Sequence, residues 1–278
     1  MHLGTLRGND QRAKVKEKLK SILEKNFSPE SYARARQSYW RFKILYRGIM
    51  SRIYAHDLTA LAKIQATDKL GSHLYTPHYE QHFRSLRKKK LRILEIGVGG
   101  YEDPILGGES LRVWKYYFPK SSIYSVDIFD KAKLQEHRIR IFRGSQNDPD
   151  FLRKVVEQMG GVDIVIDDGS HVNEHVITSF CTLFPLLAED GIYVIEDIES
   201  SYWPKLGGDS YDLGNPNTIM NFLKRLTDGL NYEEIARKDY RKTYFDQNII
   251  SLHFYHNLVF IYKGRNEEGS NHVHEHIY

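Results

Sequence analysis

Short apolar runs alternate with helical patterns of apolar residues from Leu91 onward. Buried strands are predicted by five runs rich in isoleucine and valine, at residues 91–96, 122–127, 138–143, 162–167 and 192–197. Helices are predicted between them by apolar positions at helical spacing, at residues 109–118, 149–159 and 172–188. Strands that alternate with helices are typical of a doubly wound, mostly parallel α/β sheet.

The N-terminal part predicts two helices ahead of this sheet. Residues 11–25 place apolar side chains on one stripe, and Pro29 follows a serine, which is the pattern of a helix start. The second helix is expected to run from Pro29 to Ala62, with a potential break at Gly48. The chain is thereby divided into an N-terminal helical arm, residues 1–63, and a main domain, residues 64–278.

The chain ends, after an insert at residues 200–235, in two β-rich runs that meet at His256 and Asn257. These runs predict an antiparallel hairpin beside the parallel strands, which makes a seven-stranded sheet. The arrangement resembles the Rossmann-like fold of class I methyltransferases, whereas dinucleotide-dependent dehydrogenases usually lack such a hairpin. The insert is the expected lid over a site at the end of the sheet.

Charge is distributed unevenly along the chain. Residues 11–52 hold twelve Lys or Arg against three Glu, a net charge of +9, so the total of +4 leaves −5 for the rest. A basic helical arm is suited to nucleic acid, to anionic lipid or to an acidic partner subunit. No RNA-binding motif accompanies the charge, so nucleic acid is not expected. The favoured interpretation is a helix whose aromatic residues pack on the main domain or on another protomer of a homo-oligomer.

The location of the protein is predicted from two plain features. Cys181 is the single cysteine, which excludes an internal disulfide and fits a reducing compartment. The chain has no long apolar run of the kind that crosses a membrane, and its N-terminus lacks the apolar core of a signal peptide. A cytoplasmic protein is therefore expected.

A glycine-rich strand end, Glu95-Ile-Gly97-Val-Gly99-Gly100, predicts a nucleotide site. Glycines at this position let the backbone turn sharply and approach a ligand closely. For a nicotinamide site the third glycine of the motif would fall at residue 102, where Glu102 is a poor neighbour for a pyrophosphate. A methionine-linked nucleoside carries no phosphate, and Glu95 suits its positive sulfonium and ammonium groups.

Three polar residues on the next strands complete the expected nucleoside site. Asp127 closes the second strand, where an acid accepts hydrogen bonds from ribose hydroxyls. Gln146 and Asp148 follow the third strand, where the adenine edge would be met. Asp148 precedes a proline, so a helix cap is an equal alternative for it.

Acidic residues end the fourth and fifth strands. Asp168, Glu196 and Asp197 meet in the crevice at the carboxyl ends of the strands, and three carboxylates there suit a hard cation such as Mg²⁺. His171 is the candidate base for a hydroxyl held by that cation, with a helix-capping role as the alternative. Asp167 is left outside the metal shell, because alternation along a strand turns it away from Asp168.

Four segments of residues 64–207 resemble the metal-dependent sugar O-methyltransferases. They are TDKLGSHLYTPHYEQHF, LEIGVGGYEDPILGGESLRVWKYYFP, DIVIDDGSH and YVIEDIESSYWP. The resemblance implies that Asp168, Glu196 and Asp197 bind Mg²⁺ and that His171 is the base. It also implies that residues 67–79 lie near the donor or the acceptor, that Tyr101 and Ser110 lie beside the glycine loop, and that Asp168 borders the donor. Tyr75, Tyr202 and Trp203 are the expected acceptor contacts.

These observations predict an S-adenosylmethionine- and Mg²⁺-dependent O-methyltransferase that acts on a sugar hydroxyl of a glycoside or polysaccharide. A catechol-type or other small-molecule O-methyltransferase is the nearest alternative, because vicinal oxygens on any scaffold chelate Mg²⁺. An alternative of another class is an RNA-binding protein whose α/β domain holds a nucleoside.

Overall fold

The structure, a computed structural model, describes residues 28–270 and divides the chain into two compact units, Met1–Ile53 and Tyr54–Tyr278. The helix predicted at residues 11–25 lies outside the described residues. The second unit begins earlier than the domain boundary predicted at residue 63, because α3 (Leu58–Gln65) packs on helices of the main domain.

The predicted helix from Pro29 to Ala62 is wrong in its length. Helix α2 (Pro29–Ile53) runs through Gly48 without a break and ends nine residues early. A new helix, α3, starts after Asp57, whose carboxylate accepts a hydrogen bond from the backbone N–H of Ala60 at 2.8 Å. This side-chain cap satisfies one of the free N–H groups of a helix start, which favours two helices over one.

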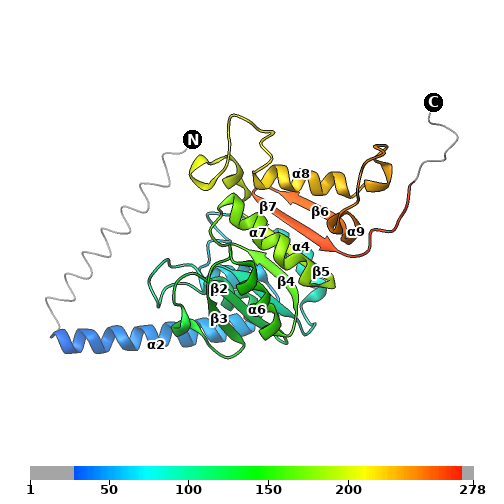
Figure 1. Ribbon diagram of the computed structural model, residues 1–278. Helices are drawn as coiled ribbons and strands as arrows, with labels where there is room; N and C mark the ends of the chain where they lie inside the picture. Colours follow the sequence, from blue (N-terminus) through cyan, green and yellow to red (C-terminus); the bar gives the residue numbers. More distant parts are fainter. Residues whose placement is uncertain (1–27, 271–278) are drawn as a thin grey trace, which may run out of the picture. The chain divides into compact units, whose positions relative to one another are not determined.

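The main domain is built on one seven-stranded sheet, in the order β3-β2-β1-β4-β5-β7-β6 (Figure 1). The strands are β1 (Arg92–Ile96), β2 (Ser122–Asp127), β3 (Ile139–Arg143), β4 (Val162–Asp167), β5 (Leu187–Glu196), β6 (Ile249–Tyr255) and β7 (Leu258–Lys263). The first five strands pair in parallel, and β7 pairs antiparallel with both β5 and β6. The predicted mostly parallel sheet with a C-terminal antiparallel hairpin is confirmed.

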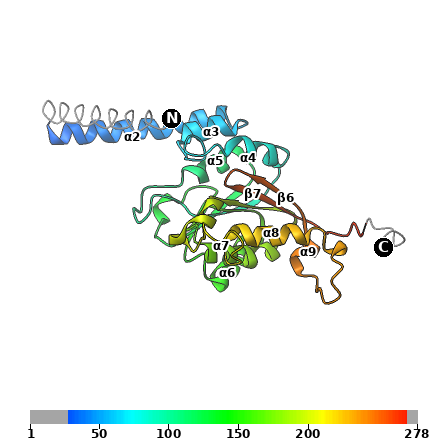
Figure 2. The ribbon, with the colours of Figure 1, turned by 90° about the horizontal axis from the view of Figure 1, so that it is seen from above.

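Helices cover both faces of the sheet. In the main domain the helices are α3, α4 (Thr76–Phe83), α5 (Glu109–Tyr117), α6 (Pro149–Met159), α7 (Asn173–Leu183), α8 (Ile219–Gly229) and α9 (Tyr244–Asn248). Short 3-10 turns are η1 (Arg84–Leu86), η2 (Ala132–Leu134), η3 (Phe184–Leu186), η4 (Ile198–Tyr202), η5 (Pro204–Leu206) and η6 (Tyr232–Glu234). Helices α3, α4 and α5 lie on one side of the sheet, and α6, α7 and α8 lie on the other (Figure 2).

Side chains that alternate along each strand build two buried clusters, one on each face. On β1, Ile93 joins the cluster under α3 to α5, while Leu94 joins the cluster under α6 to α8. On β4, Ile164 and Val165 divide in the same way. Strands covered on both faces are expected to read as near-continuous apolar runs, which is why the sequence located them well.

One predicted helix is wrong at its end. The pattern at residues 172–188 predicts a single helix, but α7 stops at Leu183 and is followed by the turn η3 and then by β5. Pro185 explains the stop, because proline has no backbone N–H to donate and its ring clashes with the preceding turn. Strand β5 therefore begins at Leu187, five residues before the predicted start at residue 192.

Within residues 28–270, no helix has the length and apolar character that crossing a membrane requires.

Candidate functional site

The candidate site lies at the carboxyl ends of three adjacent strands, β1, β4 and β5. The glycine loop follows β1, Asp168 follows β4, and Asp197 follows β5. The register pairs Ile96 with Asp167 and Asp167 with Ile195, so the three strand ends are level. In open α/β sheets this is the edge where ligands bind.

The glycine loop packs directly on the backbone of Asp168. Gly97 has φ of 95°, and a Cβ atom on it would lie 2.2 Å from the Asp168 carbonyl oxygen. A side chain at this position would therefore push the loop and Asp168 apart. Gly99 also has a positive φ, of 78°, which an L side chain rarely adopts. The sharp turn predicted for the loop is confirmed.

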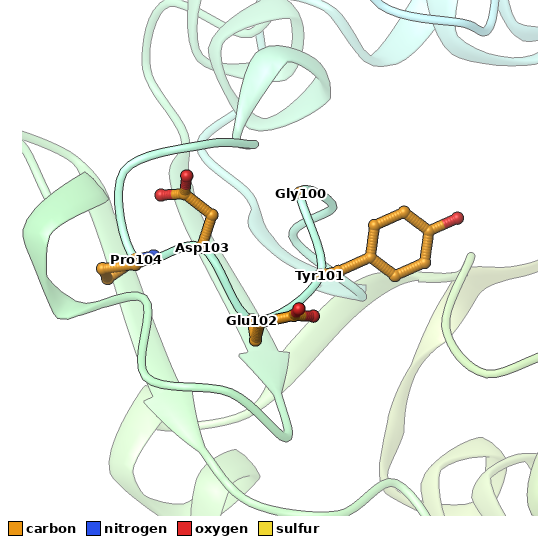
Figure 3. Close-up of a pocket in the computed structure, with 5 residues that line it drawn as sticks. All are labelled: Gly100, Tyr101, Glu102, Asp103 and Pro104. Carbon is orange, nitrogen blue, oxygen red and sulfur yellow. The ribbon is translucent and has the colours of Figure 1, made fainter.

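Beyond these glycines, residues Gly100 to Pro104 line a hollow at the surface (Figure 3). Tyr101 has φ of 47°, and its side chain is 82% exposed and projects away from the loop. The ring is therefore free to contact a ligand, and its predicted place beside the glycine loop follows from its position in the chain.

Glu95 and Ser110, both predicted to bind the donor, face each other in the buried layer between β1 and α5. The Glu95 carboxylate accepts hydrogen bonds from the Ser110 hydroxyl and the Trp114 indole N–H, each at 3.0 Å. The Lys69 ammonium lies 3.3 Å from its other oxygen. Burial raises the pKa of Glu95 to about 7, against the opposing effect of Lys69. Glu95 thus already faces one positive group of the chain.

Asp127, Gln146 and Asp148 hold backbone in place around the expected nucleoside site. The Asp127 carboxylate accepts from the N–H groups of Val98, at 3.0 Å, and Phe129, at 2.8 Å. Gln146 accepts from the Ser170 N–H at 2.7 Å and so supports the loop after β4. Asp148 accepts from two N–H groups at the start of α6, which is the helix-cap alternative. Their contacts with a donor stay predictions.

Asp168, His171 and Asp197 form a compact group of candidate metal ligands. Their ligand atoms all lie within 4.8 Å of one another. His171 Nε2 lies 3.7 Å from Asp197 Oδ2 and 4.0 Å from Asp168 Oδ1. The two carboxylates offer the oxygen ligands that a hard divalent cation such as Mg²⁺ prefers, and His171 lies beside them.

Two residues of this group have a left-handed backbone. His171 has φ of 55° and Asp197 has φ of 53°, a conformation that costs a residue with a side chain about 1–3 kcal/mol. Such costs persist where the surrounding structure demands the conformation, and they gather at functional sites. At Asp197 the backbone leaves β5, which carries its carboxylate out of the strand and toward His171.

Glu196, the third predicted metal ligand, lies deeper than the other two. Its Oε1 accepts hydrogen bonds from Lys69 Nζ, at 2.6 Å, and from the Tyr79 hydroxyl. Burial and the nearby charge of Asp168 raise its pKa well above the ordinary value. Both hydrogen bonds go to Oε1, so Oε2 is the oxygen that a metal would use. The role of Glu196 as a metal ligand stays a prediction.

Lys69 is a residue of the site that sequence reasoning missed. Its buried ammonium lies 2.6 Å from both Asp168 Oδ2 and Glu196 Oε1, and 3.3 Å from Glu95 Oε1. Burial by itself lowers the pKa of Lys69, but the three carboxylates raise it well above the ordinary value. A lysine in a polar segment predicts a surface residue, and only the resemblance of residues 67–79 pointed to this part of the chain.

Tyr75, predicted to contact the acceptor, is buried, with 3% of its surface exposed, and lies against the Asp197 carboxylate. Its hydroxyl donates to Asp197 Oδ1 at 2.7 Å. The His73 ring stacks on the Tyr75 ring, with centroids 4.7 Å apart, and its Nδ1 lies 3.7 Å from the same oxygen. His73 is a second residue that sequence reasoning did not single out.

Tyr202 and Trp203 lie on the insert, at η4 and directly after it. Their side chains are 37% and 52% exposed, which leaves aromatic surface for a ligand. Aromatic faces stack well on apolar faces of ligands and also serve in cores, and the exposure favours the first role here. Their contact with an acceptor stays a prediction.

Asn173 forms hydrogen bonds to three points of the insert, at Ser200, Leu206 and Ile219. Its buried side-chain amide donates to the carbonyls of Ser200, at 3.0 Å, and Leu206, at 2.8 Å. Its side-chain oxygen accepts from the Ile219 N–H, at 2.7 Å, where α8 begins. One side chain therefore sets the position of the segment that carries Trp203.

We expect Asn173→Ala to raise the KM for the acceptor while donor binding changes little, because three hydrogen bonds to the lid are lost. The same loss should lower the free energy of unfolding by about 1–3 kcal/mol. Steady-state kinetics and urea unfolding measure the two effects. Asn266→Ala is the matched control, since Asn266 donates to the carbonyls of Leu230, at the other end of α8, and of Asp246 on α9. Equal acceptor KM values for the two variants would contradict the role given to Asn173.

The chain is similar in sequence to named methyltransferases. The chain is 48% identical over 215 residues to mycinamicin VI 2''-O-methyltransferase of Micromonospora griseorubida, covering 77% of this chain and 54% of that protein. It is 47% identical over 210 residues to 8-demethyl-8-alpha-L-rhamnosyl tetracenomycin-C 2'-O-methyltransferase of Streptomyces olivaceus, covering 75% and 55%. The chain is a homologue of the sugar O-methyltransferases. No protein-family model matches it.

The predicted resemblance to sugar O-methyltransferases is thereby confirmed, and so is the fold. A solved structure of the MycE methyltransferase in complex with Mg, SAH and mycinamycin VI superposes with a TM-score of 0.74 at 48% identity. The match covers 77% of this chain and 55% of that one. The chain spans about half the length of the curated homologues it matches.

Proposed function

We propose that this protein is an S-adenosylmethionine- and Mg²⁺-dependent O-methyltransferase that methylates a sugar hydroxyl of a glycoside or polysaccharide. The observation that carries the proposal is the group Asp168, His171 and Asp197, which lies beside a glycine loop packed on the backbone of Asp168. A cation site and a nucleoside site are thus joined through one residue. The homologues named as sugar O-methyltransferases, and the solved MycE complex with Mg and SAH, support it.

In the proposed donor site, Gly97 and Gly99 let the backbone lie close to the nucleoside. Asp127, at the end of β2, would bind the ribose, and Gln146, which accepts from the Ser170 N–H, would meet the adenine edge. Tyr101 supplies an exposed ring at the mouth of the site.

In the proposed acceptor site, Asp168 and Asp197 would hold Mg²⁺, with Glu196 as the third ligand. Bound there, the cation lowers the pKa of an acceptor hydroxyl and orients it. His171 takes the hydroxyl proton at Nε2, the atom that faces both aspartates. The oxygen then forms a bond to the methyl carbon, the carbon–sulfur bond breaks, and the electron pair stays on sulfur as S-adenosylhomocysteine leaves.

The acceptor class is tested by incubating the full chain with S-adenosylmethionine, Mg²⁺ and a panel of rhamnosyl glycosides, other glycosides and catechols. Mass spectrometry should show a gain of one methylene on a glycoside. Methylation of catechols with glycosides untouched would replace the proposal by the small-molecule alternative. Salt-dependent RNA binding that is lost on neutralising Lys14, Lys16, Lys18 and Lys20 would favour the RNA-binding alternative.

We further propose that α2 carries the protein into a homo-oligomer by packing on a second copy of the chain. The apolar side chains of Phe42, Leu45 and Ile49 are exposed, and their spacing places them on one side of the helix. The +9 charge of residues 11–52 complements the −5 of the remainder, which attracts the arm of one copy to the body of another.

Light scattering with size-exclusion chromatography tests the oligomer. We expect the full chain to elute as an oligomer and the L45D/I49D variant as a monomer, because two charges cannot be buried against a partner. A monomeric wild type would contradict this proposal. Contact of the basic arm with anionic lipid, and a cytoplasmic location, stay predictions.

A further inference from the structure

A single segment, residues 69–79, supplies hydrogen-bond donors to the predicted metal carboxylates. Lys69 donates to Asp168 Oδ2 and to Glu196 Oε1. Tyr79, fully buried on α4, donates to the same oxygen of Glu196. One oxygen of Asp168 is therefore held by the Lys69 ammonium. One oxygen of Glu196 is held by both the ammonium and the Tyr79 hydroxyl.

The same arrangement holds at the third carboxylate. Tyr75 donates to Asp197 Oδ1. The other oxygens, Oδ2 of Asp197 and Oδ1 of Asp168, are the ones that face His171 Nε2, at 3.7 and 4.0 Å. Each aspartate thus has one oxygen held by the chain and one directed at the candidate metal position.

We propose that Lys69, Tyr75 and Tyr79 are positioning residues that orient the carboxylates for a divalent cation. The inference rests on the metal site of the proposed function and deepens it. Outer hydrogen-bond partners of metal ligands orient them, and their loss typically weakens metal binding by about 10–100-fold. Here one segment of chain holds the ligand ends of two strands, β4 and β5.

Removal of Lys69 is expected to change the metal affinity in opposite directions if the residue positions the carboxylates and if it acts only through its charge. A positive charge within 2.6 Å of two metal ligands repels a bound cation, so its removal would strengthen metal binding if charge alone decided. If Lys69 holds the carboxylates in place, its removal frees them to turn away, and metal binding weakens.

The experiment measures binding of Mg²⁺ and of Mn²⁺ to the full chain by titration calorimetry, without donor or acceptor. We expect Lys69→Met to weaken both affinities by about 10–100-fold. Lys263→Met is the matched control, because Lys263 is also buried and donates to the carbonyls of Phe184, Pro185 and Leu187 at the other end of the sheet. Its metal affinities should equal those of the wild type.

The two tyrosines test orientation without any change of charge, and they keep the inference testable if Lys69→Met does not fold. Tyr75→Phe and Tyr79→Phe should each weaken Mn²⁺ binding by about tenfold, toward the lower end of the expected range. The spectrum of bound Mn²⁺ in electron paramagnetic resonance should change as well. Tyr262→Phe is the control, since its hydroxyl bonds to His82 at 2.8 Å, away from the carboxylates.

The outcomes distinguish this inference from the proposed function. Metal affinity that is unchanged or stronger in Lys69→Met, or unchanged in both tyrosine variants, overturns the positioning role while the metal site stands. A wild-type chain that binds neither metal overturns both. Weaker binding in the three variants, with both controls normal, supports the inference.

Discussion

Asp168→Asn is expected to lower the rate of methyl transfer by about 10³-fold, equivalent to about 4 kcal/mol of transition-state stabilisation. The substitution keeps the shape of the side chain but removes the negative charge that is proposed to hold Mg²⁺. Binding of S-adenosylhomocysteine should change by no more than a few-fold, because the glycine loop packs on the backbone of Asp168 and not on its carboxylate. Initial rates against Mg²⁺ concentration, together with calorimetry of donor binding, measure both effects.

Asp163→Asn is the control at the opposite end of the same strand. Asp163 accepts hydrogen bonds from Arg92 through both carboxylate oxygens, so its loss costs stability but leaves the site alone. Normal metal-dependent turnover in Asp168→Asn would show that the cation site lies elsewhere. An equally lowered rate in both variants would show that the loss comes from the fold and not from the site.

His171→Ala is expected to lower the rate by about 10²–10⁴-fold, the usual contribution of a general base. The rate should recover partly at high pH, where hydroxide replaces the missing base. Metal affinity should change less than in Asp168→Asn, because carboxylate oxygens are the ligands that a hard cation prefers. A pH–rate profile of wild type and variant measures the effect.

His175→Ala provides the comparison four residues further along the chain, on α7. His175 Nδ1 lies 3.0 Å from the Ser170 hydroxyl and outside the group of metal ligands. Its loss should leave the rate near that of the wild type. The helix-capping alternative for His171 finds no support, because Val172 is the N-cap of α7 and no side chain caps it. If His171→Ala keeps full activity at neutral pH, the base must be sought among the other groups near Asp197, such as His73.

The strands were predictable because their signal is local. Residues 122–127 and 162–167 match β2 and β4 at both ends. The turning of Asp167 away from the site was also predictable, from strand alternation alone. Its carboxylate accepts from Ser179 on α7 at 2.6 Å, and burial raises its pKa to about 6. Asp168, one residue on, faces Lys69 instead.

The predicted helix boundaries were wrong where a single residue ends or starts a helix. Pro185 ends α7 inside an apolar pattern that continues into β5, and Asp57 starts a new helix inside a pattern that continues from α2. Hydrophobic periodicity averages over many positions, so it does not register a stop or a cap that one side chain imposes.

The sequence by itself determined the sheet, and with it the edge where the glycine loop, Asp168 and Asp197 meet, because the period of a strand and the direction of its carboxyl end are local properties. The tertiary structure decided which oxygen of each carboxylate is held and which is free. Lys69 reaches Asp168 and Glu196 across 99 and 127 residues of chain. No local pattern encodes such a contact, since it forms only when separate segments pack and a buried charge must find its partners.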